Sequence, residues 1–83
     1  MLDPAQIRAA RALLGWTQED LSKASGVGTA TIQRMEKSNQ MISGYVSTLV
    51  RLQEAFQKAG ILFIDDDEVG GYGLRLARRK RSR

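Results

Sequence analysis

Two short segments on either side of Gly26 constrain the fold more than any other feature of the sequence. Thr17 is a natural N-cap, and Asp20 stands three residues later as a weaker form of the capping box, so a helix is expected over about 18–25. Gly28 occupies the N-cap position of the segment that follows. Because glycine tolerates a positive φ, these two short helices are predicted to meet at a tight turn at Gly26.

The residues around this turn meet the physical demands of two crossing helices. Ser22 is a small residue at the expected crossing point. The side chains that would hold the crossing together are apolar: Leu21, Val27, Ile32 and Met35. The side chains that would face outward from the second helix are short or polar: Thr29, Ala30, Gln33 and Arg34. Helices joined in this way can present the second one to base edges in the major groove, so the pattern predicts a DNA-binding unit.

Further helices are expected on both sides of this unit. Asp3 followed by Pro4 is a good helix start, with a side-chain acceptor at the N-cap and a proline at the first helical position, and Gly15 is the stop. Lys37–Ser43 is predicted as a connecting loop, and a longer amphipathic helix is expected over about 44–59. The apolar set of that helix is Val46, Leu49, Val50, Leu52 and Phe56.

Beyond Gly60 the apolar pattern becomes that of short strands. Ile61–Ile64 is predicted as one strand, Asp65–Gly71 as a turn and Tyr72–Ala77 as a second strand, which together form a β-hairpin. The predicted fold class is therefore mainly α, a four- to five-helix domain with a C-terminal β-hairpin. We divide the chain into a helix-turn-helix domain over 1–60, a hairpin over 61–77 and a basic disordered tail over 78–83.

Both faces of the first predicted strand are apolar, because Leu62 and Ile64 point to the side opposite Ile61 and Phe63. One face can cover the helices, and the other needs a second cover. The hairpin of another copy would provide it in a two-fold homodimer, which makes the hairpin the expected dimerisation element. A monomer whose tail folds back over the hairpin is the alternative.

Charge is concentrated at the C-terminal end of the chain. Residues 61–68 carry four acids and no base, whereas residues 69–83 carry six bases and no acid, within a net charge of +4. The basic run Arg78–Arg83 is interpreted as an arm attracted to DNA phosphates, a solubilising end or an address signal. The acidic run Asp65–Glu68 is interpreted as a solvated turn rather than a cation site, because consecutive residues entering a turn rarely converge on one ion.

The chain contains no cysteine and no histidine, so it lacks thiolate chemistry, the usual general base and the usual imidazole metal ligand. We therefore expect no enzymatic activity, no metal and no cofactor. The N-terminus has neither a basic start nor a long apolar run, and no stretch approaches the roughly 18 apolar residues that span a bilayer. A cytoplasmic protein without a membrane partner is expected.

The run from Gln6 to Glu36 resembles the phage-repressor helix-turn-helix family of the Cro/repressor, xenobiotic-response-element type. The residues that carry the resemblance are Arg11, Trp16-Thr17-Gln18-Glu19-Asp20-Leu21, Gly26-Val27, Thr31-Ile32 and Met35-Glu36. The similarity covers about residues 5–60. It implies a bacterial transcriptional regulator, a repressor that binds double-stranded DNA and reads the major groove with its third helix.

The resemblance also implies roles for individual residues. Gln18 matches a glutamine that bonds a backbone phosphate, and Thr31 matches a phosphate-contacting hydroxyl. Arg11 and Glu36 match an ion pair that ties the first helix to the end of the third. The leading base-reading positions and the next exposed turn are matched by Thr29, Ala30, Gln33 and Arg34.

The sequence departs from the family pattern at a few positions. Ser22 and Ser25 stand where alanine or a larger aliphatic residue is common, and Gly28 replaces a usual serine or threonine cap. Ala30 cannot hydrogen-bond a base, so it could offer only apolar contact, for example to a thymine methyl group.

Two other roles fit the same sequence. In the first, the chain is an antitoxin or another partner-binding protein, whose hairpin or tail binds a protein and whose DNA binding is autoregulatory. In the second, it is a dimeric scaffold that never meets DNA. The expected partners are therefore double-stranded DNA and a second copy of the chain, with a different protein bound through the hairpin as the alternative.

Overall fold

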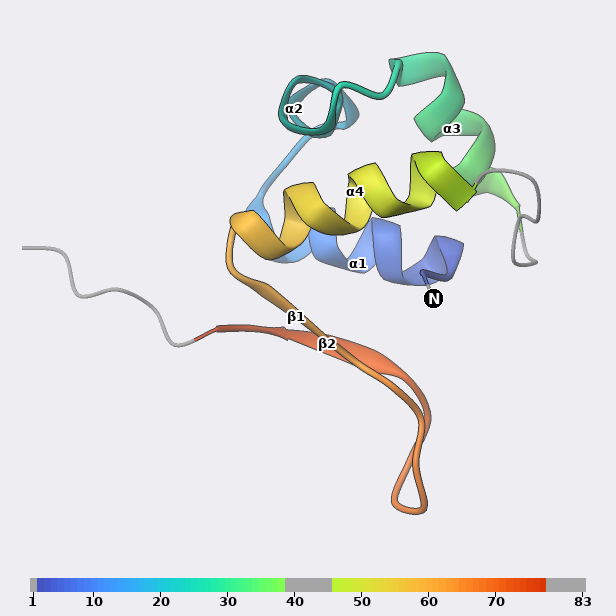
Figure 1. The fold of residues 1–83 in the computed structure, drawn as a ribbon, viewed down its shortest axis with the longest axis vertical. Helices are drawn as coiled ribbons and strands as arrows, with labels where there is room; N and C mark the ends of the chain where they lie inside the picture. The colour runs from blue at the N-terminus through green and yellow to red at the C-terminus, as the bar shows by residue number, and fades with distance from the viewer. Residues whose placement is uncertain (1, 39–45, 78–83) are drawn as a thin grey trace, which may run out of the picture.

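The computed structural model describes residues 2–38 and 46–77. The elements of the described part, in chain order, are α1 (Pro4–Leu14), α2 (Gln18–Ser25), α3 (Thr29–Lys37), α4 (Val46–Lys58), β1 (Ile61–Ile64) and β2 (Gly73–Leu76). The two strands form an antiparallel hairpin, so the prediction of a mainly α fold with a C-terminal hairpin is confirmed (Figure 1). The predicted tail over 78–83 lies outside the described residues, as do 39–45, which include most of the predicted loop.

The helix boundaries follow the local signals in the sequence. Asp3 caps α1 by accepting a hydrogen bond from the N–H of Ala5 at 2.8 Å. Gly15 ends the helix in the left-handed region, with a φ of 71°. The predicted start and stop of the first helix are therefore confirmed.

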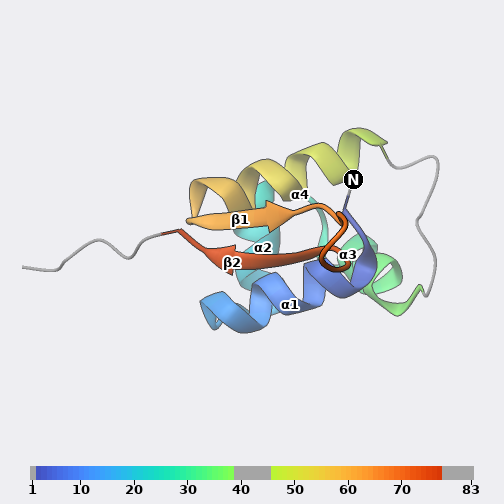
Figure 2. The same cartoon turned by 90° about the horizontal axis from the view of Figure 1, so that it is seen from below.

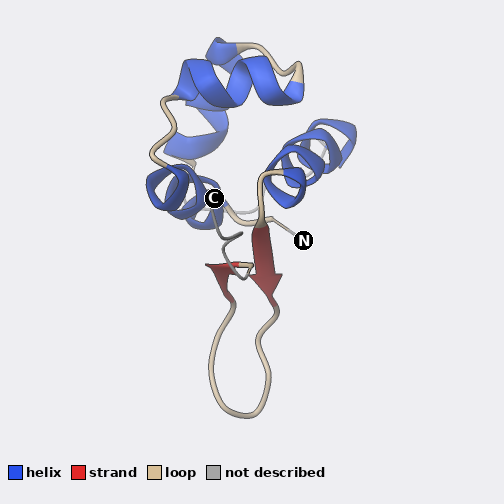
Figure 3. Cartoon of the chain, turned by 90° about the vertical axis from the view of Figure 1, so that its left-hand side faces the viewer, coloured by secondary structure: helices blue, strands red, loops and turns tan. Residues whose placement is uncertain are grey.

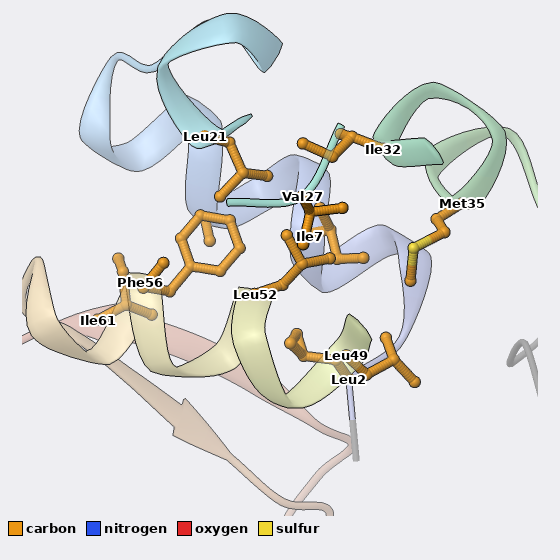
Figure 4. Packing of buried hydrophobic residues seen from close by; sticks show 12 residues of the cluster. Leu2, Ile7, Leu21, Val27, Ile32, Met35, Leu49, Leu52, Phe56 and Ile61 are labelled. Atoms are coloured by element: carbon orange, nitrogen blue, oxygen red, sulfur yellow. The ribbon is translucent and has the colours of Figure 1, made fainter. Parts of the chain in front are cut away.

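One apolar core joins the helices and the hairpin (Figure 4). Its largest fully buried side chains come from every element except β2: Ile7, Leu21, Ile32, Met35, Leu52, Phe56 and Ile61. The ring of Trp16 stacks on that of Phe56 with centroids 5.9 Å apart, and Phe56 meets Phe63 edge to face at 6.1 Å. These ring contacts connect the α1–α2 link, α4 and the hairpin.

Two members of the apolar set expected for α4 do not belong to the core. Val46 is 61 % exposed and Val50 is 48 % exposed, whereas Leu49 and Leu52 are buried. The two valines are four residues apart and therefore lie on one side of the helix. That side turns away from the core. The predicted apolar face of this helix was therefore too wide, because it included the two valines.

The hairpin packs against α1 and α4, with β1 on the α4 side and β2 beside α1 (Figure 2). The face that packs against the core consists of Ile61, Phe63, Leu74 and Leu76. Leu62 and Ile64 point the other way and are 46 % and 40 % exposed, which confirms the predicted alternation in β1. The turn of the hairpin extends away from the helices (Figure 3).

Gln6 connects the start of α1 to the start of β2. Its side chain is almost fully buried, and its Oε1 accepts a hydrogen bond from the N–H of Asp3 at 3.0 Å. Its Nε2 donates to the carbonyl of Gly73 at 3.0 Å, across 67 residues of sequence. One amide therefore completes the cap of α1 and fixes the position of the hairpin.

Candidate nucleic-acid interface

The start of α2 is held by a reciprocal cap. Thr17 Oγ1 accepts a hydrogen bond from the N–H of Asp20 at 3.0 Å, and the Asp20 carboxylate accepts one from the N–H of Thr17 at 2.9 Å. The bond from the Thr17 backbone lowers the pKa of Asp20, because it favours the ionised carboxylate. The predicted helix over 18–25 and its capping box are confirmed.

The turn between α2 and α3 is held by backbone and side-chain hydrogen bonds together. Gly26 has a φ of 78°, and its N–H donates to the carbonyl of Ser22 at 2.8 Å. The Ser25 hydroxyl donates to the carbonyl of Leu21 at 2.7 Å and accepts from the N–H of Val27 at 3.1 Å. Ser25 therefore ties the last turn of α2 to the entry of α3, a role that the sequence pattern did not reveal.

Helix α3 has one buried face and one solvent-exposed face. Ile32 and Met35 are fully buried in the core. The side chains of the other face are exposed or half-exposed: Thr29, Ala30, Thr31, Gln33 and Arg34. Arg34 Nη2 donates to Thr31 Oγ1 at 3.2 Å, and a guanidinium with five N–H donors remains able to bind a further acceptor. The helix lies at the end of the molecule opposite the hairpin turn (Figure 1).

The first turn of α3 is open to solvent at Gly28. This residue is the N-cap, with an extended backbone, and it supplies no side-chain hydrogen bond to the helix. A Cβ atom at this position would meet nothing within 4 Å. The N–H groups of a first helical turn carry a partial positive charge, which favours a nearby anion.

Glu36 is the centre of a polar cluster that fixes α3 against α1 and α2. Its side chain is 5 % exposed, and its carboxylate accepts hydrogen bonds from Arg11 Nε at 2.7 Å, Arg11 Nη2 at 2.8 Å and Gln18 Nε2 at 3.0 Å. Arg11 also donates to the carbonyl of Trp16 at 3.0 Å, and Arg8 donates to the carbonyl of Glu36. Hydrogen bonding to Glu36 raises the pKa of Arg11. No pattern in the sequence indicated the contact made by Arg8.

Gln18 is half-buried at the start of α2, and one of its amide N–H groups is directed to Glu36. A side-chain amide carries a second N–H group and an acceptor oxygen. The residue that the resemblance assigns to a phosphate therefore also supports the carboxylate that orients α3.

The acidic run after β1 forms a turn in which Asp67 bonds its own backbone neighbours. Asp67 Oδ1 accepts hydrogen bonds from the N–H groups of Val69 and Gly70 at 2.9 and 3.1 Å. Within residues 2–38 and 46–77, no group of three or more possible metal ligands gathers in one place. None of the helices described is both long and apolar enough to cross a membrane.

Comparison with known sequences adds one match. A family model described as helix-turn-helix matches residues 7–59, more than half of the chain. The matched range contains α2, α3, α4 and most of α1, and it ends before β1. No curated protein matches the chain.

Proposed function

The chain belongs to the Cro/C1-type helix-turn-helix family of DNA-binding regulators, and we propose that it is a transcriptional repressor that reads the major groove with α3. The observation that carries this proposal is the division of α3 into two faces. Ile32 and Met35 hold one face in the core, while Gln33 and Arg34 stand in solvent on the other. Base readout needs such a firmly held helix with unobstructed polar side chains. No catalysis is part of the proposed role.

The base contacts in this proposal come from the exposed face of α3. The Arg34 guanidinium suits the two acceptors on a guanine edge, and the Gln33 amide suits the acceptor and donor of an adenine. Thr29 can bond to a base through its hydroxyl, and Ala30 offers apolar contact to a thymine methyl group. These contacts would determine which duplex is preferred.

The phosphate contacts in this proposal come from the start of α2 and the first turn of α3. Gln18 and Thr31 each carry a side-chain donor, and the uncapped N–H groups after Gly28 add backbone donors. Contacts of this kind set the register of a protein on DNA but do not read its sequence. The Arg11–Glu36 pair would hold the angle of α3 without touching DNA.

We also propose that two copies bind together, with the hairpin over 61–77 as the dimerisation element. Helix α3 lies at the opposite end of the molecule from the hairpin turn, so association through the hairpin leaves α3 accessible (Figure 1). Two such helices would contact half-sites about 34 Å apart on one side of the duplex. The proposed setting is the bacterial cytoplasm, with the protein on the nucleoid when it is bound to DNA.

The basic run Arg78–Arg83 is proposed to be drawn to DNA phosphates. It carries five bases in six residues, and each phosphate that a base neutralises releases counterions. Deleting these residues should therefore flatten the dependence of DNA affinity on salt and preserve the sequence preference. If the deletion leaves the salt dependence of DNA affinity unchanged, the run would instead serve to keep the protein in solution.

The decisive experiment selects bound duplexes from a random DNA pool and then titrates the preferred duplex in gel-shift assays. Arg34→Ala should weaken binding to this duplex by about 1–3 kcal/mol and relax the preference at one or two base pairs. Lys58→Ala is the matched control. It removes one exposed positive charge from the last turn of α4, at the end of that helix that does not follow α3 in the chain. Equal losses on the selected and scrambled duplexes would refute base reading, and failure to enrich any duplex would refute the whole proposal.

The antitoxin role is the second candidate, and the exposed outer face of the hairpin supports it. Leu62 and Ile64 offer an apolar surface on which another protein could pack. A toxin encoded by a neighbouring gene should then copurify with the chain and be lost on Leu62→Lys. Full repression by the chain alone would favour the first candidate.

A further inference from the structure

A second arginine of α1, Arg8, binds the backbone at the end of α3. Its Nη1 donates a hydrogen bond to the carbonyl of Glu36, across 28 positions of sequence. Glu36 is the residue before the last one of α3, and the last four carbonyls of an α-helix have no partner within the helix. The guanidinium of Arg8 therefore satisfies one of these carbonyls and places a positive charge at the negative end of the helix dipole, where a cation is favourable.

The two arginines of α1 bind Glu36 in different ways. Arg11 binds the carboxylate at the end of the side chain, whereas Arg8 binds the main chain. They are three positions apart on α1, so both extend from one face of that helix. A carboxylate can keep its hydrogen bonds while its side chain changes rotamer, but a carbonyl moves with the backbone. The bond from Arg8 therefore restrains the axis of α3 itself.

The restrained end of α3 lies next to two of the side chains proposed to read bases. Gln33 and Arg34 are exposed, and both lie within one helical turn of Glu36. Thr29 lies at the opposite end of the helix, where the N-cap residue supplies no side-chain hydrogen bond. A displacement of the C-terminal turn would therefore move Gln33 and Arg34 more than Thr29.

Burial indicates that Arg8 contributes more to the placement of α3 than to the stability of the fold. Arg8 is exposed, whereas the Glu36 side chain that Arg11 binds is 5 % exposed. Water can reach the site of an exposed donor and bond the carbonyl in its place, at little cost in stability. A water molecule does not tie the end of α3 to α1, so the restraint on its position would still be lost.

We propose that Arg8 is a positioning residue for base reading, which holds the C-terminal turn of α3 through the carbonyl of Glu36 and so determines how well Gln33 and Arg34 select their base pairs. Arg8 makes no contact with DNA in this proposal. The inference rests on the proposed reading by α3, and it places a determinant of sequence preference on α1, outside the two helices that form the reading unit.

The first test compares affinities for the selected and the scrambled duplex in gel-shift titrations. Arg8→Ala should lower the ratio of the two affinities about fivefold, because the helix is less firmly placed for specific contacts. It should relax the preference at the base pairs that Arg34→Ala relaxes, and not at those that Thr29→Ala relaxes. Arg8→Lys keeps a positive charge and a donor and should retain most of the ratio. Lys58→Ala, the control on α4, should leave the ratio unchanged.

The salt dependence of binding distinguishes positioning from direct contact with DNA. Arg8→Ala should leave the slope of affinity against salt unchanged, since no phosphate contact is removed. Equal weakening on both duplexes, with the slope reduced by about one, would show that Arg8 binds a phosphate and would overturn the proposal. An unchanged ratio of affinities would overturn it as well.

A measurement without DNA separates this inference from the proposed function. In Arg8→Ala, hydrogen exchange should speed up in the last turn of α3 and not in α2, and the urea midpoint should fall much less than in Arg11→Ala. Unchanged exchange in that turn, or a midpoint as low as that of Arg11→Ala, would overturn the positioning role even if the wild type reads DNA. A wild type that prefers no duplex would instead refute the reading by α3, and Arg8 would then serve the fold alone.

Discussion

Arg11 on α1 donates two hydrogen bonds to the carboxylate of Glu36 on α3, one of 2.7 Å from Nε and one of 2.8 Å from Nη2. The two residues are 25 positions apart in the sequence. The Glu36 carboxylate also accepts a hydrogen bond from Gln18, and it is almost fully buried. The orientation of the proposed reading helix therefore depends on a polar cluster as well as on the apolar core.

Removal of Arg11 should be costly for the fold. Arg11→Ala leaves the buried Glu36 carboxylate with only the Gln18 amide from its present side-chain donors. We expect the free energy of unfolding to fall by about 3–5 kcal/mol, as when one partner of a buried pair is removed. Urea denaturation followed by Trp16 fluorescence measures the loss. Arg51→Ala, at an exposed position of α4, should change stability by less than about 0.5 kcal/mol, and a similar loss in both variants would contradict the role given to Arg11.

Removal of the Gln6 amide should loosen the hairpin. Gln6→Ala leaves both the Asp3 N–H and the Gly73 carbonyl without this partner, which should lower stability by about 1–3 kcal/mol. Hydrogen exchange should speed up in β1 and β2 more than in α3. Gln57→Ala removes an exposed amide from α4 and serves as the control. Uniform acceleration across the chain would show that Gln6 supports the whole fold and not the hairpin in particular.

The uncapped start of α3 offers a route to a more stable protein. Gly28 has a φ of −63°, and a Cβ atom added there meets open space. Gly28→Ser should therefore raise the free energy of unfolding by about 0.5–1 kcal/mol, through a new cap and a less flexible unfolded chain. Gly26→Ala should instead lower it by about 1–2 kcal/mol, because Gly26 has a φ of 78°. Thermal unfolding of both variants checks the two opposite signs.

The cap of α2 should make stability depend on pH. Folding lowers the pKa of Asp20, so its cap contributes stability above the ordinary pKa of an aspartate, about 4, and loses it as the pH falls through the folded value. Asp20→Asn should therefore reduce the loss of stability on acidification. Urea midpoints across this pH range test the effect, with Glu54→Gln on α4 as the matched control. If the urea midpoints of Asp20→Asn and the wild type change in parallel with pH, the contribution assigned to the Asp20 carboxylate is refuted.

The sequence alone determined the elements whose signals are local. The caps at Asp3 and Thr17 and the stop at Gly26 act within four residues, so neighbouring residues suffice to predict them. The alternation in Ile61–Ile64 likewise follows from strand geometry alone, and it predicted an apolar outer face. The division of α3 into two faces follows from the spacing of its apolar residues in the same way.

Only the tertiary structure decided which distant groups meet. The contact of Gln6 with Gly73 spans 67 residues, and no local pattern encodes it. The exposure of Val46 and Val50 depends on how α4 is rotated about its own axis against its neighbours. The spacing of apolar residues along the helix does not fix this rotation. The concave surface lined by Leu13, Tyr72 and Leu74 lies between α1 and β2, and it exists because the hairpin packs beside α1. Such features arise from the packing of whole elements, so they are fixed only once all the elements are assembled.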